Sequence, residues 1–446
     1  MDKGSRTVKL VQRVAAAATL ALAVTACSDP SAGPAAPAAG GSPAAWPSPT
    51  ARLDGVTLTI WAAQNSNTVP KAVTDAFTQA TGAKVEVVTI PDPYEQGVQT
   101  KVATGDKPDL AFWQPTASML TALNARANLQ PLDGAPWVEA LSPELRDITG
   151  LLDETRYAAL VTSPAVEGVY YNKQVFAANG VKETPKNFDE MLQVARTLKG
   201  KGVTPFFEMA GDKWATQWWV QVQLADAAKS GLWERVNTGK ETFEDTTILD
   251  AVKTYKALID EGLFNADIKT AKFEDQGEAL LSGKAAMAIQ VNSFFGQLQA
   301  KADTAELDEK IGFFPISPSG NVGTSIPDQS NALVAFRTGD TGREAAARQL
   351  LAYWMGPGYA AFVADRKTVS LRPDVPTPDG VPQALRDVHA SLGRSVGSMQ
   401  SLAVANPDLY LNLADMITGS LTPEQVAAAT QKQFAQLAKA AVATGF

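Results

Sequence analysis

Alternating apolar and polar positions open the folded part of this chain, and helical spacing follows them. Residues 53–63 (LDGVTLTIWAA) alternate as a half-buried strand does, and residues 84–91 (KVEVVTIP) repeat the alternation. Between these two runs the spacing predicts a helix over residues 70–80, whose apolar face consists of Val73, Ala76, Phe77 and Ala80. Gly82 is placed to end that helix.

The same alternation of strand and helix continues along the chain. Another helix is expected after Tyr94, followed by a short strand at residues 109–113. Further helix starts are marked by residues that cap a helix: Asn187 with Glu190, Thr341 with Glu344, and Thr422 with Pro423. Strands that alternate with helices predict an α/β protein with mostly parallel sheets.

A different pattern occupies the N-terminus. Basic residues are followed by an uncharged apolar run from Val14 to Val24, and then by Thr25, Ala26 and Cys27. The run of about 11 residues is shorter than the roughly 20 that a membrane-spanning helix needs. The pattern is typical of a secretory signal peptide at residues 1–26. Its last four residues resemble a bacterial lipobox, which implies that the Cys27 thiol is acylated and anchors the chain to a membrane.

Residues 28–52 are dominated by Pro, Ala, Gly and Ser, so we expect a flexible tether over residues 27–52. The 446-residue chain has a formal net charge of −8 and shows no basic cluster, which argues against nucleic acid as a partner. It has one cysteine and one histidine, His389. A Cys/His metal site and a Cys/His nucleophile pair are therefore not expected, and we expect His389 to lie at the surface. We expect no cofactor.

Four segments carry distinctive motifs in a fixed order. They are GDKPDLAFW at residues 105–113, a stretch that begins GVYYNK at residues 168–206, one that contains GKAAMAI at residues 273–295, and IGFFPISPSG at residues 311–320. Together they resemble the extracellular solute-binding proteins of bacterial ABC transporters, family 1, which includes maltose- and oligosaccharide-binding proteins.

The resemblance implies a type II periplasmic-binding-protein-like α/β fold, with two lobes of discontinuous chain and a ligand cleft between them. By this analogy the first lobe comprises residues 53–162 and 290–338, and the second comprises residues 163–289 and 339–446. The chain would cross between lobes near residues 160–169, 288–292 and 336–342.

Candidate ligand contacts combine aromatic rings with amides, as a neutral polar ligand requires. Loops after the expected strands contain Trp61, Gln64, Asn65, Trp113 and Gln114, at the sheet edge where open α/β folds bind ligands. In the second lobe Trp214 is the preferred tryptophan, while Trp218 and Trp219 are left open between core and cleft. The resemblance adds Asn292, Phe294, Phe295, Asp328 and Gln329. Tyr171 and Arg372 complete the set, although the YYNK motif is mostly structural in the family, and we expect Asp109 to be a structural anchor.

The resemblance implies that the chain is not an enzyme but a monomeric, membrane-anchored receptor, which binds a carbohydrate outside the cytoplasm and delivers it to ABC permease subunits. Binding of a non-sugar solute, or ligand sensing for a signalling partner, remains an alternative. An extracellular glycosidase would need a positioned pair of carboxylates, and no motif supports one.

Overall fold

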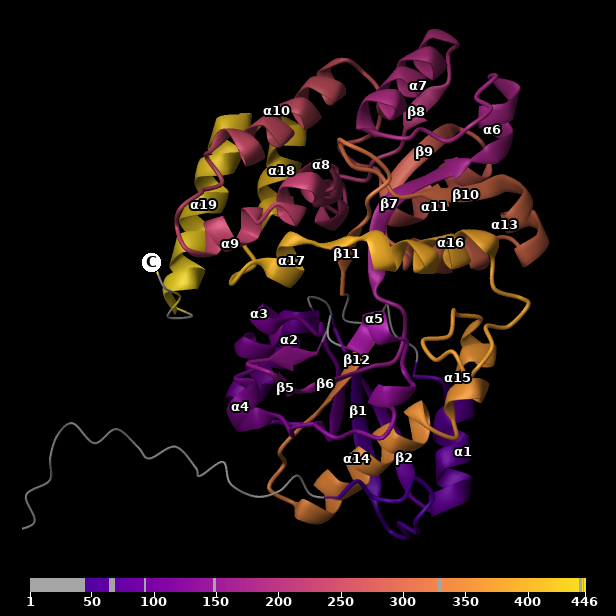
Figure 1. Cartoon of the computed structure of the whole chain (residues 1–446), viewed down its shortest axis with the longest axis vertical. Coiled ribbons are helices and arrows are strands. Elements are labelled where there is room, and N and C mark those ends of the chain that lie inside the picture. The colour runs from indigo at the N-terminus through magenta and orange to yellow at the C-terminus, as the bar shows by residue number, and fades with distance from the viewer. Residues whose placement is uncertain are drawn as a thin grey trace, which may run out of the picture. The chain divides into compact units, whose positions relative to one another are not determined.

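The computed structural model describes residues 45–63, 69–91, 94–146, 150–327, 331–440, 443 and 445–446. The first lobe is built on a five-stranded sheet of order β2-β1-β3-β12-β6 (Figure 1). Its strands are β1 (Thr57–Ala63), β2 (Lys84–Ile90), β3 (Leu110–Phe112), β6 (Ala158–Leu160) and β12 (Ala332–Ala335). β1 runs parallel to β2 and β3, whereas β12 is antiparallel to both β3 and β6.

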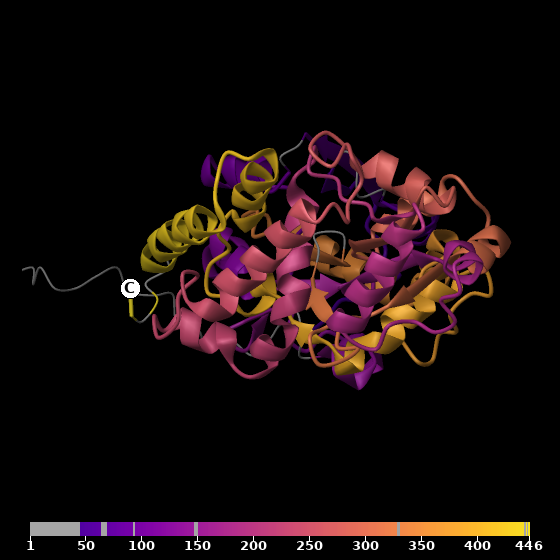
Figure 2. The same cartoon turned by 90° about the horizontal axis from the view of Figure 1, so that it is seen from above.

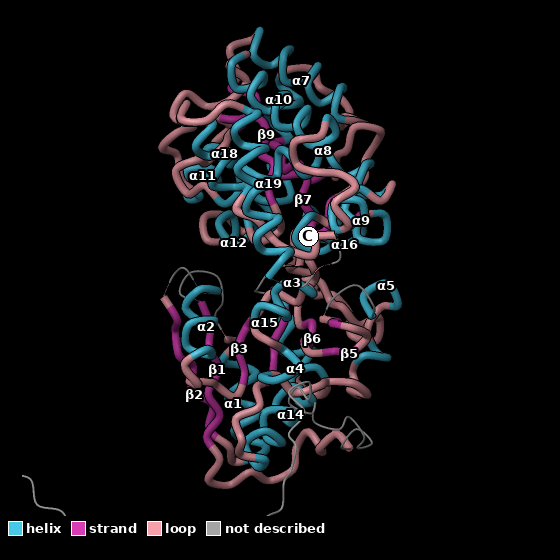
Figure 3. Tube along the Cα trace, turned by 90° about the vertical axis from the view of Figure 1, so that its left-hand side faces the viewer, coloured by secondary structure: helices cyan, strands magenta, loops and turns pink. Residues whose placement is uncertain are grey.

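Side chains alternate between the two faces of this sheet. Leu58 and Ile60 of β1 pack on one face, against helices α1 (Lys71–Thr81), α14 (Thr341–Met355) and α15 (Tyr359–Arg366). Trp61 and Ala63 pack on the other face with α2 (Tyr94–Ala103) and α3 (Ala117–Ala122). Figure 3 shows these strands among the helices that cover them. The strand period of two thus assigns each β1 residue to one of two cores.

Smaller elements complete the first lobe. They are α4 (Ala125–Asn128), the 3₁₀ turn η1 (Val138–Ala140), α5 (Pro143–Arg146), and a hairpin of β4 (Leu151–Leu152) and β5 (Thr155–Arg156).

The second lobe is built on a six-stranded sheet, in which β13-β11-β7-β9-β8 form the path and β10 also pairs with β7. Its strands are β7 (Ala165–Asn172), β8 (Thr204–Phe206), β9 (Ala285–Gln290), β10 (Ile311–Phe314), β11 (Thr324–Ile326) and β13 (Val396–Gly397). β7 is the longest of these strands and is antiparallel to β9, β10 and β11. Every residue of β7 except Tyr171 is buried.

Helices surround this second sheet. They are α6 (Lys173–Ala178), α7 (Phe188–Gly200), η2 (Trp214–Gln217), α8 (Trp218–Lys229), α9 (Leu232–Asn237), α10 (Thr246–Asp260), α11 (Phe273–Leu281), α12 (Phe294–Gln299), α13 (Thr304–Lys310), α16 (Gln383–Ser391), η4 (Leu392–Arg394), α17 (Met399–Leu402), α18 (Leu409–Thr418) and α19 (Pro423–Ala440). α10 packs against α8, α18 and α19, and Figure 2 shows the C-terminal helices in yellow beside the rose-coloured ones.

Three connections join the two lobes: β6 to β7, β11 to β12, and α15 to α16. The first two are hydrogen-bonded to each other through Asn331, which is buried. Its side-chain amide donates to the Ser163 carbonyl at 2.8 Å and to the Thr162 hydroxyl at 3.0 Å. The third connection contacts the first through His389 of α16, whose Nδ1 lies 3.1 Å from the Ser163 hydroxyl. His389 is half-buried at this junction, so its predicted surface location is wrong.

The predicted lobe boundaries differ from this topology after residue 289. β10 and β11 pair with β7, so most of residues 290–326 lies in the second lobe rather than the first. Residues 341–366 form helices that pack on the first sheet, although residues 339–446 were all expected in the second lobe. The expected crossings at residues 288–292 and 336–342 were placed by analogy. Strand pairing places one crossing between β11 and β12, and helix packing places the other between α15 and α16.

Local helix signals fare better. Both ends of α1 lie within one residue of the expected bounds, and the helix ends at Gly82, whose φ of +85° suits glycine. The box at Thr422 is present, because Gln425 N donates to Thr422 Oγ1 and Thr422 N donates to Gln425 Oε1. The start of α14 is shifted by one residue: Asp340, not Thr341, accepts from the first backbone amides.

The signal peptide, Cys27 and most of the tether lie outside the described residues. Residues 45–52 were expected to be flexible tether, but Trp46 and Ala51 among them are hydrogen-bonded to the first lobe. Within the part of the chain that the structure describes, no helix is both long and apolar enough to span a bilayer.

Candidate functional site

The carboxyl ends of β1 and β3 are joined by a buried tyrosine. The Tyr94 hydroxyl donates to the Phe112 carbonyl at 2.7 Å and to the Trp61 carbonyl at 3.2 Å. Burial raises the pKa of Tyr94, so the hydroxyl stays a donor at neutral pH. Glu95 follows at the start of α2. This edge of the first sheet is therefore rigid, and it presents residues of α2 and α3 to the second lobe.

The predicted tryptophans of this edge are buried. Trp61 is 4% exposed and packs between the sheet and α2, with the Lys101 ammonium 5.3 Å from its ring centroid. Trp113 is fully buried, and its Nε1 donates to the Met119 carbonyl at 2.9 Å. Trp113 thus forms core in this structure, and Gln114 beside it is half-buried. Gln64 and Asn65 lie outside the described residues.

The second lobe presents an aromatic corner built around Trp214. Its half-buried ring lies edge-on to Trp218, with centroids 6.3 Å apart, and to Phe273 at 5.1 Å. Trp214 N donates to the Asp212 carbonyl at 2.7 Å, and Lys213 between them has φ 65° and ψ −51°. These values describe a γ-turn with positive φ, which is strained for a residue other than glycine. Strain of this kind is retained where a side chain must be aimed, here Trp214.

Trp218 and Trp219, left open from the sequence, separate in the structure. Trp219 is fully buried and stacks on Tyr255, with ring centroids 5.6 Å apart and planes 10° apart. Trp218 is 5% exposed, and its Nε1 has no hydrogen-bond partner among the described residues. Trp219 is therefore core. Its Nε1 also has no partner among the described residues, so Trp218 differs from it in lying beside Trp214.

Next to this corner lies a group of buried polar side chains, which we call the Glu167 cluster: Glu167, Gln217, Gln221, Thr324 and Gln400. Thr324 of β11 lies opposite Glu167 of β7 in the strand register. Gln221 Oε1 accepts from Met399 N at 3.1 Å, and Gln400 Nε2 donates to Gln217 Oε1 at 2.8 Å. These bonds hold α17 against α8.

The Glu167 cluster has unused hydrogen-bonding capacity. Among the described residues, both carboxyl oxygens of Glu167, the Thr324 hydroxyl, Gln221 Nε2 and Gln400 Oε1 are buried without a partner. Burial raises the pKa of Glu167 well above its usual value. Buried polar groups in proteins are almost always paired, so a concentration of unpaired ones calls for an explanation.

Two observations place the cluster and the aromatic corner toward the first lobe. α17, which carries Gln400, contacts α3 of the first lobe. Tyr410 of α18 is half-buried, its pKa is raised by burial and by the charges of Asp408 and Glu95, and Glu95 belongs to α2 of the first lobe. The Tyr410 carbonyl also accepts from Thr216 at 2.9 Å, within the turn that follows Trp214.

The other predicted contacts are engaged elsewhere. Tyr171 is half-buried, and its ring packs on Phe176 and Phe314 above Gly312, where an added Cβ would lie 2.3 Å from Tyr171 Cε1. Asn292 Oδ1 accepts from Val166 N at 3.1 Å.

Phe294 and Phe295 are buried against Tyr170, with ring centroids 5.4 and 5.7 Å from it. Arg372 is ion-paired with Asp374 at 2.6 Å and also donates to the Met355 carbonyl. Asp328 and Gln329 lie outside the described residues.

Sequence reasoning missed Glu167, Thr324, Gln400 and Tyr410. One signal was available. Glu167 is the only charge in the strand AVEGVYYN, and a lone carboxylate in a buried strand needs either a partner or a function.

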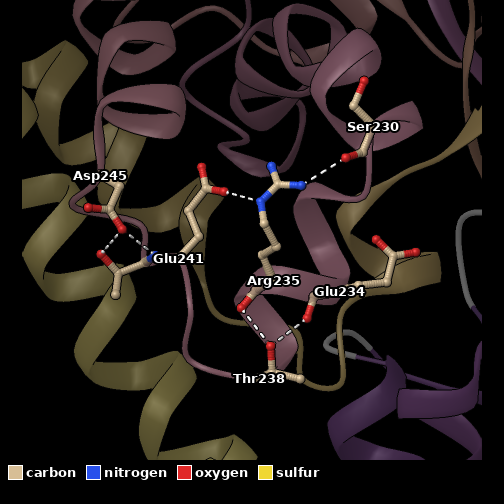
Figure 4. Close-up of polar contacts among 7 residues, drawn as sticks. Ser230, Glu234, Arg235, Thr238, Glu241 and Asp245 are labelled. Carbon is tan, nitrogen blue, oxygen red and sulfur yellow. Dashed lines mark hydrogen bonds and ion pairs between the residues drawn. The ribbon is translucent and has the colours of Figure 1, made fainter.

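A second polar cluster has no such capacity. Figure 4 shows Arg235 donating to Glu241 at 2.7 Å and to the Ser230 carbonyl at 2.8 Å, while the Thr238 hydroxyl donates to the Glu234 and Arg235 carbonyls. These bonds fix the connection between α9 and α10, so we interpret the cluster as structural. The described residues contain no group of three or more His, Cys, Asp or Glu side chains that could hold a metal ion.

Comparison with known proteins agrees with the two-lobed fold. Residues 62–361 match the family model described as bacterial extracellular solute-binding protein. An uncharacterized ABC transporter extracellular-binding protein of Pyrococcus horikoshii, PH1214, is 25% identical over 228 residues, which are 50% of each chain. The chain spans about half the length of the curated relatives it matches.

Solved structures match over much more of the chain. A chitin oligosaccharide binding protein superposes with a TM-score of 0.72 at 20% identity, covering 86% of this chain and 99% of that one. The protein RafE in complex with raffinose gives 0.68 at 20% identity, covering 86% and 100%. At this identity the likeness establishes the fold: two α/β lobes of the type II periplasmic-binding-protein class.

Proposed function

Because the chain belongs to the bacterial extracellular solute-binding proteins, we propose that it is the substrate receptor of an ABC importer. In this proposal a neutral carbohydrate binds between the lobes and the closed form delivers it to the permease. Acylation of Cys27 holds the receptor at the outer face of the cell membrane. The family consists of substrate-binding proteins, so we expect binding without turnover.

The unpaired carboxyl group of Glu167 carries this proposal. A buried carboxyl group offers acceptor oxygens and, when protonated, one O–H donor to the hydroxyl groups of a ligand. A ligand with several hydroxyl groups supplies the donors that Glu167 lacks among the described residues, and it can also use Gln400 Oε1 as an acceptor. Adding this ligand would convert a costly buried group into a satisfied one.

The aromatic corner supports a sugar over other polyhydroxylated ligands. Sugar rings have faces of C–H groups, and Trp214 offers a half-exposed ring within 6.3 Å of Trp218. The Trp218 Nε1 donor and the Thr324 hydroxyl can reach the oxygens at the rim of such a ring. The candidate site contains no cation among these residues, which favours neutral over anionic sugars.

Two neighbours in fold suggest which sugars to test, since one is named for chitin oligosaccharide and the other holds raffinose. A thermal-shift and calorimetry screen over raffinose, chitin oligosaccharides, simple hexoses and a hexose phosphate tests the proposal. Ligand at about 100 times its dissociation constant should stabilise the protein by about 2.7 kcal/mol. We expect a neutral sugar to give this shift and the phosphate to give none. Product formation, or no shift with any neutral sugar, would contradict the proposal.

Anchoring needs a separate test. Cys27→Ala should abolish incorporation of radiolabelled fatty acid and release the protein from membranes, while its affinity for the sugar stays unchanged. A variant that stays on the membrane would contradict acylation at Cys27.

A further inference from the structure

The last residues of the expected tether lie on the first lobe. Trp46 Nε1 donates to the Asp133 carbonyl at 3.2 Å, and the Trp46 ring is edge-on to Trp137 with centroids 4.8 Å apart. The Arg348 guanidinium lies 4.1 Å from the centroid of the same ring, in cation–π geometry. Trp46 therefore packs between two parts of the first lobe that are about two hundred residues apart in the chain.

A second attachment follows a few residues later. Gln349 of α14 is 2% exposed, and its Nε2 donates to the Ala51 carbonyl at 2.7 Å and to the Pro49 carbonyl at 3.4 Å. Pro47 and Pro49 restrict φ in the turn between the two attachments, which lowers the entropy lost on docking. Leu53 N then donates to the Thr81 carbonyl at 2.7 Å, at the end of α1.

Each of these partners belongs to the first lobe. We propose that residues 46–52 form a clasp that fixes the end of the expected tether to the first lobe, so that the attachment point of the tether lies at Trp46. The inference rests on the proposed anchoring at Cys27. It makes the first lobe the anchored lobe, and it leaves the second lobe to move relative to the membrane when the lobes close.

The clasp changes the length and the attachment point of the tether. A Pro/Ala/Gly/Ser segment acts as a flexible spacer, and its length and attachment point set the effective concentration of the tethered body at a membrane partner. A tether that ends at a fixed point on one lobe also restricts how the folded protein is oriented at the membrane. Composition alone does not separate the clasp from the rest of the tether, because residues 45–50 are, like the residues before them, rich in Ala, Pro and Ser.

Trypsin provides a direct test, because Arg52 is the first basic residue after Cys27. Its side chain is exposed, so cleavage there depends on local opening of the clasp. We expect Trp46→Ala to raise the initial rate of cleavage after Arg52 by about tenfold, since proteolysis follows the population of the open form. Gln349→Ala should raise it less. Trp214→Ala replaces a tryptophan of the second lobe and should leave the rate of cleavage after Arg52 unchanged.

Pulsed electron paramagnetic resonance gives an independent readout. Spin labels at Ala45→Cys and Lys71→Cys, in a Cys27→Ala background, should give a narrow distance distribution that broadens when Trp46→Ala is added. A broad distribution without Trp46→Ala, or equal cleavage rates with and without it, would overturn the clasp. Both measurements use unanchored protein without ligand, so failure of acylation or of sugar binding would leave this test intact.

Discussion

The two lobes bury the same kinds of side chain for opposite purposes. In the first lobe Asp109 is fully buried. Its Oδ2 accepts from Thr59 N at 2.8 Å and from Arg343 at 2.6 Å, while its Oδ1 has no partner among the described residues. In the second lobe Glu167 is equally buried, yet neither oxygen is paired among the described residues. The tryptophans do not divide by lobe. Trp113 uses its donor internally, whereas the Nε1 donors of Trp218 and Trp219 in the second lobe and of Trp354 in the first have no partner among the described residues. The contrast between the lobes therefore rests on the carboxyl groups, of which, in the described part of the chain, Asp109 is ion-paired and Glu167 is not.

The largest expected effect comes from Trp113 of the first lobe. Trp113→Ala should lower the unfolding free energy by about 4 kcal/mol, because it leaves a large cavity in a packed core and removes the hydrogen bond from Trp113 Nε1 to the Met119 carbonyl. Urea unfolding of the ligand-free protein measures this loss. Trp214→Ala is the matched control and should cost about 1 kcal/mol or less, because its ring is only partly buried. Equal losses in the two variants would remove the contrast between these two tryptophans.

Next in size is a pH effect from a third buried carboxyl, Glu208. It accepts from Met209 N at 2.7 Å and from the Tyr255 hydroxyl at 3.0 Å, while burial raises its pKa to about 7. The unfolded carboxyl titrates near ~4.3, so between these values the folded protein holds a proton that the unfolded chain has released. The unfolding free energy should therefore fall as pH rises through this window, by up to about 3 kcal/mol, and level off above it.

Glu208→Gln should flatten that dependence, measured by urea unfolding between pH 4.5 and pH 8. Glu167 has a raised pKa as well, and it contributes a fall of the same sign that remains in the variant. A profile unchanged by Glu208→Gln would show that Glu208 does not titrate in this range.

The ion pair of the first lobe comes third. Asp109→Ala should lower the unfolding free energy by about 2 to 3 kcal/mol, because it leaves Thr59 N without its acceptor and Arg343 without its partner. The partial exposure of Arg343, at 40% of its side chain, keeps the loss at the lower end for a broken buried pair. Calorimetric affinity for the sugar should not change, and a variant that folds normally but binds weakly would move Asp109 into the ligand site.

Local features were predictable from the sequence because they depend on near neighbours. The helix face that includes Val73 and Phe77, the end of that helix at Gly82 and the box at Thr422 follow from spacing within a few residues. The lobe to which each segment belongs was not predictable from local sequence. It depends on strand pairs such as Ile311 with Asn172, which are far apart in the chain. The expected two-lobed fold was right, while the segments after residue 289 were assigned to the wrong lobes.

For the candidate site, too, the residue types were visible in the sequence, but their burial and partners were not. A tryptophan at a strand end is visible in the sequence, but whether its ring is covered depends on helices from elsewhere, as α3 covers Trp113. The charge of Glu167 was equally visible. Its lack of a partner depends on how β11 and α8 pack against β7, and no local pattern specifies that packing.

Glu167→Gln tests the comparison most sharply, although its effect is the smallest of these. Glutamine keeps the shape of the side chain but replaces one carboxyl oxygen with an NH2 donor, so affinity for the sugar should fall by about thirtyfold, or about 2 kcal/mol. Stability of the ligand-free protein at pH 8 should stay equal or rise, because a buried group that resists ionisation is replaced by a neutral amide. Glu208→Gln, also buried in the second lobe but partnered, should leave affinity unchanged. If both variants bind the sugar like the unmodified protein, Glu167 is a structural residue like Asp109, and the difference between the lobes does not reflect ligand binding.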